Sequence, residues 1–156
     1  MAFKFERLEV WQMSLDYVDL IYKVAEQLPK NEDFNLKSQI TRAAVSVSLN
    51  IAEGSTGQTD AEQARFLGLA IRSLIETVAC QHLINRRNYL TDKAQLRELS
   101  TKADALLVKL TAMRKAIEPT QAWLREERET YNVAGNAWTE VAEVAPPSSV
   151  IRPPSE

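Results

Sequence analysis

The absence of proline between residues 36 and 118 is the feature that most constrains the fold of this chain. Its six prolines are Pro29, Pro119 and four more beyond residue 145. Proline lacks a backbone N–H and clashes with the preceding helical turn, so it is disfavoured in a helix interior. Residues 36–118 can therefore form long helices, with a proline marking each border.

Apolar residues recur at helical spacing in three segments, residues 8–28, 59–88 and 91–117. The second segment opens with Thr59 and Glu62, a capping-box pair, and we expect Thr91 to cap the third. The seam of the first segment is Leu8, Trp11, Leu15, Val18, Tyr22 and Ala25. The seam of the last is Leu96, Leu99, Ala103, Leu106, Leu110, Met113 and Ile117.

Residues 42–54 are ambiguous in the sequence. Val45, Val47, Leu49 and Ile51 alternate with polar residues, which is typical of a half-buried strand. A second set has helical spacing instead: Leu36, Ile40, Ala43, Val47 and Ile51. A lone strand would have no partner for its backbone, so the helical interpretation prevails by elimination.

The alternation of apolar and polar residues in 45–51 can also be explained on a helix. Residues two apart lie about 200° apart on a helix, so alternating apolar residues cover both of its sides. We therefore expect the helix over residues 35–53 to be buried on two faces, one against its own bundle and one against a neighbouring subunit. Asn35 is expected to cap its start, and Gly54 to close its end in a left-handed conformation.

These segments predict an all-α fold, an antiparallel up-down-up-down four-helix bundle over residues 1–118. Residues 119–156 form an acidic, proline-containing tail that we expect to be largely irregular. Trp138 and the pair Val150 and Ile151 are apolar islands in this tail, of the kind that dock into a partner groove. A solvated tail with incidental hydrophobic residues is an equally weighted alternative.

Several classes of protein are disfavoured. With Cys80 as the one cysteine no intramolecular disulfide forms, and Cys80 and His82 are too few for a metal site. No catalytic Ser/His/Asp set or phosphate loop is evident, so we expect no enzyme activity and no cofactor. The lack of a signal peptide and of a run of about 18 apolar residues predicts a cytoplasmic protein without a membrane span. The net charge of -2 lacks the strong excess of Lys and Arg that is typical of nucleic-acid-binding proteins.

The chain nevertheless resembles the bacterial four helix bundle protein family. That family includes the 23S rRNA intervening-sequence proteins and the accessory variability determinants of diversity-generating retroelements. The resemblance covers residues 3–117 and is most specific in its Asn-Ile-Ala-Glu-Gly element. The matching motifs are Leu8-Glu9-Val10-Trp11-Gln12, Ile21-Tyr22, Leu28-Pro29, Phe34-Asn35-Leu36, Gln39-Ile40, Arg42-Ala43-Ala44, Asn50-Ile51-Ala52-Glu53-Gly54, Phe66-Leu67 and Ala70-Ile71-Arg72-Ser73.

This resemblance implies a homopentameric barrel of four-helix subunits without known catalytic activity. In the retroelement branch, it implies binding to a reverse transcriptase and to nucleic acid. Asn35 and Arg72 depart from the family pattern, which usually has glycine at both positions.

A cluster of cations is the candidate nucleic-acid contact, and a ring of subunits would repeat it into a strong local field. It consists of Arg86, Arg87, Lys93 and Arg97. The alternative is a solvated helix end with favourable dipole interactions.

Two further sets of residues are candidates for the core or for a subunit interface. Trp11 and Tyr22 are expected on the seam of the first helix, in the core or between subunits. Val45 and Leu49 belong to the second apolar side of the ambiguous helix. We expect Arg42, Asn50 and Glu53 to be largely buried. An internal hydrogen-bond set that fixes their helix against its neighbours is favoured over a ligand site or conformational latch.

Two functions remain open. One is a non-enzymatic homo-oligomeric scaffold, pentameric by the resemblance, that binds RNA, DNA or a ribonucleoprotein partner such as a reverse transcriptase. The other is a protein–protein adaptor that recruits its partner through residues 119–156.

Overall fold

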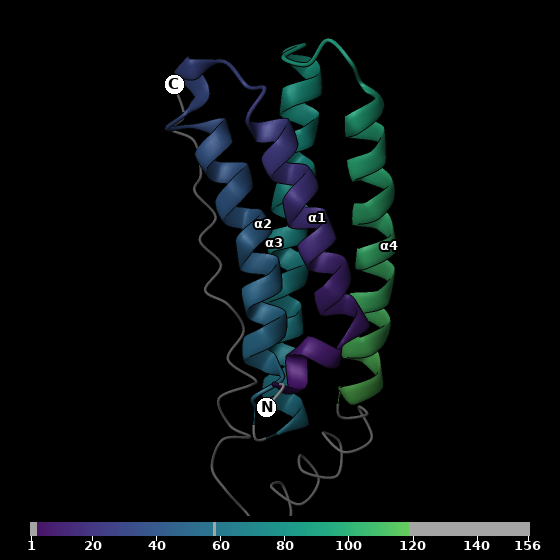
Figure 1. Cartoon of the computed structure of the whole chain (residues 1–156). Coiled ribbons are helices and arrows are strands. Elements are labelled where there is room, and N and C mark those ends of the chain that lie inside the picture. The colour runs from purple at the N-terminus through teal and green to yellow at the C-terminus, as the bar shows by residue number, and fades with distance from the viewer. Residues whose placement is uncertain (1–2, 58, 119–156) are drawn as a thin grey trace, which may run out of the picture. The chain divides into compact units, whose positions relative to one another are not determined.

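The computed structural model describes residues 3–57 and 59–118 of the chain. Within these ranges the protein is all-helical, with four long helices, two short 3-10 helices and no strand. The elements are η1 (Lys4–Arg7), α1 (Glu9–Ala25), η2 (Lys30–Glu32), α2 (Leu36–Gly54), α3 (Asp60–Arg86) and α4 (Ala94–Ile117). The long helices lie side by side (Figure 1), and α1 and α3 each pack against both α2 and α4.

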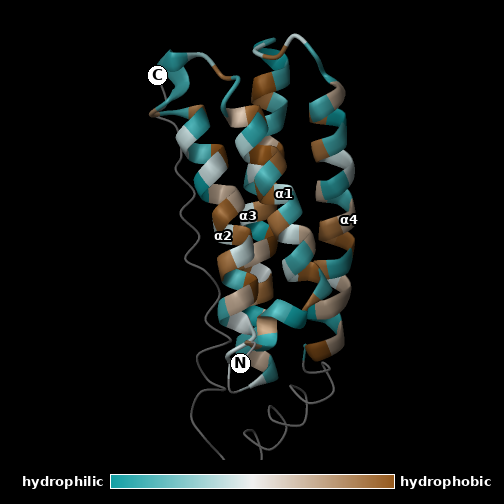
Figure 2. Ribbon diagram, viewed as in Figure 1, coloured by the Kyte–Doolittle hydropathy of each residue, from teal (hydrophilic) through white to brown (hydrophobic). Residues whose placement is uncertain are grey.

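The helical interpretation of residues 42–54 is confirmed, because they lie inside α2. All five residues with helical spacing in this segment, from Leu36 to Ile51, are buried in the core. In α4 the predicted seam is also buried from Leu96 to Leu110, while Met113 and Ile117 pack against the core from its edge. Hydrophobic residues recur along all four helices (Figure 2).

The predicted seam of α1 is not the stripe that faces the core. Leu15 and Tyr22 are exposed, and Leu8, Trp11 and Val18 are only partly buried; Ala25, the last residue of the predicted seam, is buried as expected. The core stripe is shifted along the helix and consists of Val10, Ser14, Tyr17, Ile21 and Val24.

The core stripe of α1 was not recognised in the sequence because it contains two polar side chains. The Ser14 hydroxyl donates to the carbonyl oxygen of Trp11 at 2.6 Å. The Tyr17 hydroxyl is bonded to Thr77 Oγ1 at 2.6 Å and accepts from Gln81 Nε2 at 2.7 Å. Because each hydroxyl has a partner inside the bundle, these positions can be buried although the residues are polar.

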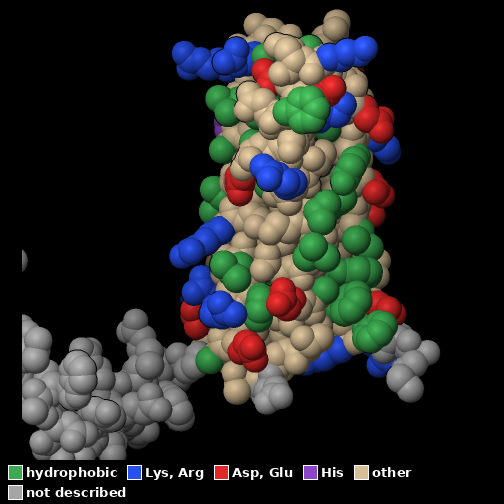
Figure 3. Space-filling model, turned by 90° about the vertical axis from the view of Figure 1, so that its left-hand side faces the viewer, with side chains coloured by type: hydrophobic (Ala, Val, Ile, Leu, Met, Phe, Trp, Pro, Cys, Tyr) green, Lys and Arg blue, Asp and Glu red, His purple; other side chains and the backbone are tan. Residues whose placement is uncertain are grey.

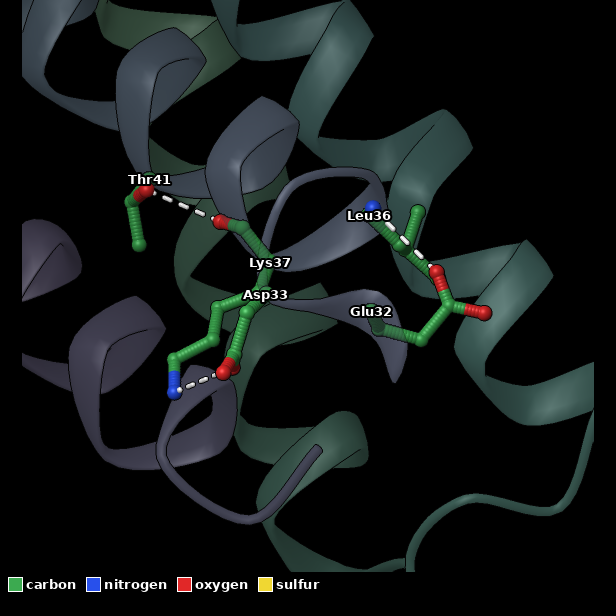
Figure 4. A network of polar contacts seen from close by, with 5 residues as sticks. All are labelled: Glu32, Asp33, Leu36, Lys37 and Thr41. Carbon is green, nitrogen blue, oxygen red and sulfur yellow. Dashed lines mark hydrogen bonds and ion pairs between the residues drawn. The ribbon is translucent and has the colours of Figure 1, made fainter. Parts of the chain in front are cut away.

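The start of α2 differs from the expected Asn35 cap. Asn35 has a φ of -123° and makes no capping bond to the helix; its amide donates to Glu32 Oε2 at 3.0 Å. Glu32 takes the capping role, because the same carboxylate oxygen accepts the N–H of Leu36 at 3.3 Å (Figure 4). At the neighbouring turn, Lys37 pairs with Asp33 at 3.1 Å.

Gly54 is also used differently from the prediction. It is the last residue of α2, and Ser55 follows in right-handed helical geometry. A Cβ at Gly54 would lie 2.7 Å from Phe66 Cβ, closer than packed atoms approach. Glycine at this position therefore permits the close approach of α2 and α3 rather than a left-handed turn.

The two remaining predicted caps have different outcomes. Thr59 accepts the N–H of Glu62 at 3.2 Å, as the capping-box pattern predicts. The Thr91 cap is wrong: α4 begins at Ala94, whose N–H donates to Asp92 Oδ1 at 2.8 Å. The Asp92 carboxylate satisfies the first amide of the helix, so Thr91 is not needed there.

α3 is the one helix in the described part of the chain that is long and apolar enough to cross a membrane. An 18-residue window in it has a mean hydropathy of 1.2, and 39% of that window is buried in the bundle. A core helix meets the same criterion of length and composition, so this is weak evidence for a span. The absence of a membrane span stays a prediction.

Candidate functional site

The side of the bundle formed by α1 and α2 carries an uncovered apolar surface, which we call the outer apolar face. Leu49 is 61% exposed and Tyr22 is 46% exposed. A groove of about 270 Å³ runs between the two helices, lined by Tyr22, Thr41, Arg42, Val45, Ser46 and Leu49. Figure 3 views the molecule from the α2 side and shows hydrophobic side chains in a row along its length. The outer apolar face consists of Trp11, Leu15, Val18, Tyr22, Val45 and Leu49.

The apolar alternation in α2 explains the residues that this helix contributes to the outer apolar face. Val47 is fully buried in the bundle core, while Leu49, two residues further, is exposed on the opposite side. At one end of the face Trp11 meets the Phe5 ring edge-on at 4.8 Å, and Phe5 stacks on Phe3. η1 therefore covers part of Trp11, whereas the middle of the face has no cover within the described chain.

The polar residues of α2 lie nearer the surface than expected. Arg42 and Glu53 are exposed and Asn50 is half-buried, so their expected burial is wrong. They occupy the solvent side of α2, because the core side is filled by the five apolar residues from Leu36 to Ile51.

Two of these residues still connect α2 to α3 through short relays. Arg42 Nη2 donates to Gln39 Oε1 at 2.9 Å, and Gln39 in turn donates to Glu76 of α3. Asn50 Nδ2 donates to Ser46 Oγ at 3.0 Å, and that oxygen also accepts from the Ser73 hydroxyl of α3 at 3.0 Å. These relays support the structural interpretation of Arg42 and Asn50 over a ligand site.

The predicted cation cluster lies at the end of the bundle where α3 passes into α4. Arg86, Arg87, Lys93 and Arg97 are all exposed. Lys93 Nζ donates to Asn88 Oδ1 at 3.2 Å, and Asn88 has a left-handed φ of 53° that ends α3. The ion pairs found within residues 3–57 and 59–118 involve other cations, namely Lys37, Lys109 and Arg114. None of the four cations takes part in these ion pairs, although the charge of Arg87 also acts on the carboxylate of Glu32.

The same end contains a buried carboxylate that the sequence did not reveal. Glu32 is only 5% exposed, and its Oε1 accepts the hydroxyl of Tyr89 at 2.6 Å. That hydrogen bond, with smaller contributions from Leu36, Asn35 and the charge of Arg87, holds the pKa of Glu32 below its usual value. It also raises the pKa of Tyr89, since it stabilises the protonated phenol. The contact ties the α1–α2 connection to the α3–α4 connection, and we call it the Glu32–Tyr89 tie.

The remaining candidates from the sequence do not form a chemical site. Cys80 is buried, and burial raises the pKa of its thiol; His82 is exposed on the same helix. Within the described part of the chain, no three His, Cys, Asp or Glu side chains come together in a way that suits a metal ion. Trp138, Val150 and Ile151 lie outside the described residues.

Comparisons with known proteins agree on the family and the fold. Residues 6–112 match the family described as 23S rRNA-intervening sequence protein. The chain is similar to the crystal structure of a protein of unknown function from the S23 ribosomal protein family of Bacteroides thetaiotaomicron, with a TM-score of 0.62. The two are 24% identical, and the alignment covers 68% of this chain and 98% of that chain, so the likeness shows the fold alone. No curated protein matches the chain.

Proposed function

The chain belongs to the 23S rRNA-intervening sequence protein family, and we propose that it is a non-enzymatic homo-oligomeric scaffold that binds nucleic acid or a ribonucleoprotein such as a reverse transcriptase. The outer apolar face is the observation that carries this proposal. Contiguous exposed apolar surface marks interaction sites in proteins. This face spans two adjacent helices, α1 and α2. The subunit is an up-down-up-down antiparallel bundle, the order that short connections favour.

A closed ring, such as the pentamer that the family resemblance implies, needs two different complementary surfaces on each subunit. The outer apolar face is the first. The second is the exposed side of α3, where Ile75 is 54% and Leu83 is 50% exposed, with Ala79 between them. In the ring, the outer apolar face of one subunit covers this stripe of the next.

Light scattering tests the assembly. The wild type is expected to have a mass several times 17.6 kDa, and Leu49→Glu is expected to reduce it to that of one chain. A glutamate would place an unpaired charge at the centre of the buried contact, which is strongly unfavourable. Val108→Glu is the matched control, since Val108 is exposed on α4 outside both surfaces and should leave the mass unchanged. A monomeric wild type would overturn the scaffold.

The cation cluster is the proposed contact with nucleic acid. In a ring the four charges of each subunit recur around one end, and such a field attracts phosphates more strongly than one subunit can. Figure 3 shows Lys and Arg side chains projecting at this end, the upper one in that view. Binding driven by phosphate contacts weakens steeply with salt, so it is best measured at low salt.

A gel shift at low salt tests this contact. Changing Arg86, Arg87, Lys93 and Arg97 together to glutamate is expected to weaken binding by more than about tenfold, since each phosphate contact adds to affinity. The control makes the same change in net charge at the other end of the bundle, at Lys4, Arg7, Arg65 and Lys115, all exposed. If both variants bind as the wild type does, the cluster is not the contact.

The second candidate is an adaptor that recruits a protein through residues 119–156. The family match ends at residue 112, so this segment lies outside the matched region. Pull-downs with and without residues 120–156 separate the candidates. The adaptor requires that the set of captured partners changes.

A further inference from the structure

Phe34 is the most exposed large hydrophobic side chain in the described part of the chain. It lies in the connection between η2 and α2, and it is 100% exposed. The residues on both sides of it are engaged: Asp33 pairs with Lys37, and Asn35 donates to Glu32. The backbone of this connection is therefore well supported, while the phenyl ring has no contact that would account for its position.

The residues next to Phe34 in the chain are polar, and the nearest cation cluster lies on the neighbouring connection. It is the one apolar residue between positions 30 and 35. The Glu32–Tyr89 tie joins its connection to the α3–α4 connection, which carries the cation cluster. Of the two acidic residues before it, Asp33 is paired with Lys37, and the side chain of Glu32 is buried and directed to Tyr89, Asn35 and Leu36 rather than to the surface.

This arrangement fits a nucleic acid better than an apolar protein surface. A protein contact needs neighbouring apolar residues, and Phe34 has none in its own connection. A base offers a flat π-face to one aromatic ring while its phosphates contact nearby cations. In a duplex the bases are stacked on each other, so the ring can reach only an unpaired base.

We propose that Phe34 stacks on an unpaired base of a single-stranded nucleic acid whose phosphates contact Arg86, Arg87, Lys93 and Arg97. This inference rests on the proposed nucleic-acid function and specifies its ligand class. The cations supply affinity for any nucleic acid, and Phe34 supplies the preference for single strands.

Fluorescence anisotropy of the full chain at low salt tests the inference with two probes, an oligouridylate and an RNA duplex of equal length. Phe34→Ala is expected to weaken binding of the oligouridylate by about 5- to 100-fold and to leave duplex binding unchanged. Phe34→Trp is expected to retain or increase the affinity, because indole also stacks. Val108→Ala is the control for removal of an exposed hydrophobic side chain. Since Phe34 is fully exposed, none of these changes should alter the thermal unfolding of the protein.

The possible outcomes separate this inference from the proposed function. If Phe34→Ala binds oligouridylate as the wild type does while the four-cation variant does not, the stacking role is wrong and the proposed function stands. If the wild type binds neither probe, the inference is wrong, and so is direct RNA binding by the cation cluster. Equal weakening toward both probes would refute the preference for unpaired bases. A changed mass of Phe34→Ala by light scattering would assign the ring to a contact between copies of the chain and overturn the inference.

Discussion

Two stripes of α1 have the same spacing and opposite surroundings. The stripe from Val10 to Val24 is buried against the bundle, and the stripe from Leu8 to Tyr22 lies at or near the surface. Both repeat at intervals of three and four residues, so spacing alone cannot tell which one faces the core. The comparison teaches that the two stripes differ in their neighbours: the first is covered by the bundle, whereas Leu15 and Tyr22 of the second stay exposed within residues 3–57 and 59–118. The proposed assembly would cover the second stripe.

The largest expected difference between the stripes is in packing energy. Ile21→Ala should lower the free energy of unfolding by about 2–5 kcal/mol, since Ile21 is fully buried and its loss leaves a cavity. Tyr22→Ala, at the next residue, should lower it by less than about 0.5 kcal/mol. Both are measured by denaturant unfolding in the Leu49→Glu background, where assembly is not expected to contribute. Equal losses would contradict the assignment of the two stripes.

A smaller effect is expected from adding a methyl group where helices meet closely. Gly54→Ala places a Cβ 2.7 Å from Phe66 Cβ and should destabilise the fold by about 1–3 kcal/mol through overpacking. At Gly68 the nearest atom, Arg114 Cζ, would be 3.5 Å away, an ordinary contact. Gly68→Ala should therefore stabilise the protein by about 0.5–1 kcal/mol through helix propensity. Melting temperatures that shift in the same direction would contradict this account.

The smallest effect separates the two tyrosines of α1. Tyr17→Phe should cost about 1–2 kcal/mol, because it removes the acceptor of the buried Gln81 amide. Tyr22→Phe, on the exposed stripe, should cost almost nothing. The measurement is denaturant unfolding of both variants at neutral pH, and a larger loss for Tyr22→Phe would reverse the assignment.

The pH dependence of stability is an independent test of whether Tyr17 is buried. Burial raises the pKa of Tyr17 from 10.0 to about 12. The folded state therefore keeps a proton that the unfolded state releases, so the contribution of Tyr17 to stability is complete below pH 10 and declines from pH 10 to about 12. The difference in stability between wild type and Tyr17→Phe should shrink over this range, and a constant difference would mean that Tyr17 is not buried in solution.

Much of the fold could be predicted from the sequence. The proline-free stretch and the spacing of Leu36, Ile40 and Ile51 place α2 and its core side correctly, because in α2 the residues with helical spacing are the apolar ones that face the core. The stripe of α1 could not be predicted in the same way. Ser14 and Tyr17 are polar in the sequence, and only their hydrogen bonds explain their burial: Ser14 donates to Trp11 in its own helix, and Tyr17 bonds to Thr77 of α3.

The candidate site was also predictable only in part, because some of its features leave a pattern in the sequence and others depend on contacts between distant residues. The alternation of Val47 and Leu49 predicts a second apolar side of α2, and Leu49 is indeed exposed; its role in assembly stays a prediction. The Glu32–Tyr89 tie joins residues 57 positions apart and leaves no local pattern. Phe34 in a polar turn gives no sign of its exposure, since an aromatic residue in such a turn is equally able to fold back onto the bundle.

The Glu32–Tyr89 tie has a consequence for binding energetics. A connection that is ordered before its ligand arrives has little conformational entropy left to lose, so more of each contact appears as affinity. One carboxylate that accepts from Tyr89, Asn35 and Leu36 anchors both connections at this end of the bundle. Pre-organisation of these two connections would therefore be weakened when Glu32 is protonated, because a carboxylic acid accepts these hydrogen bonds less strongly than a carboxylate does.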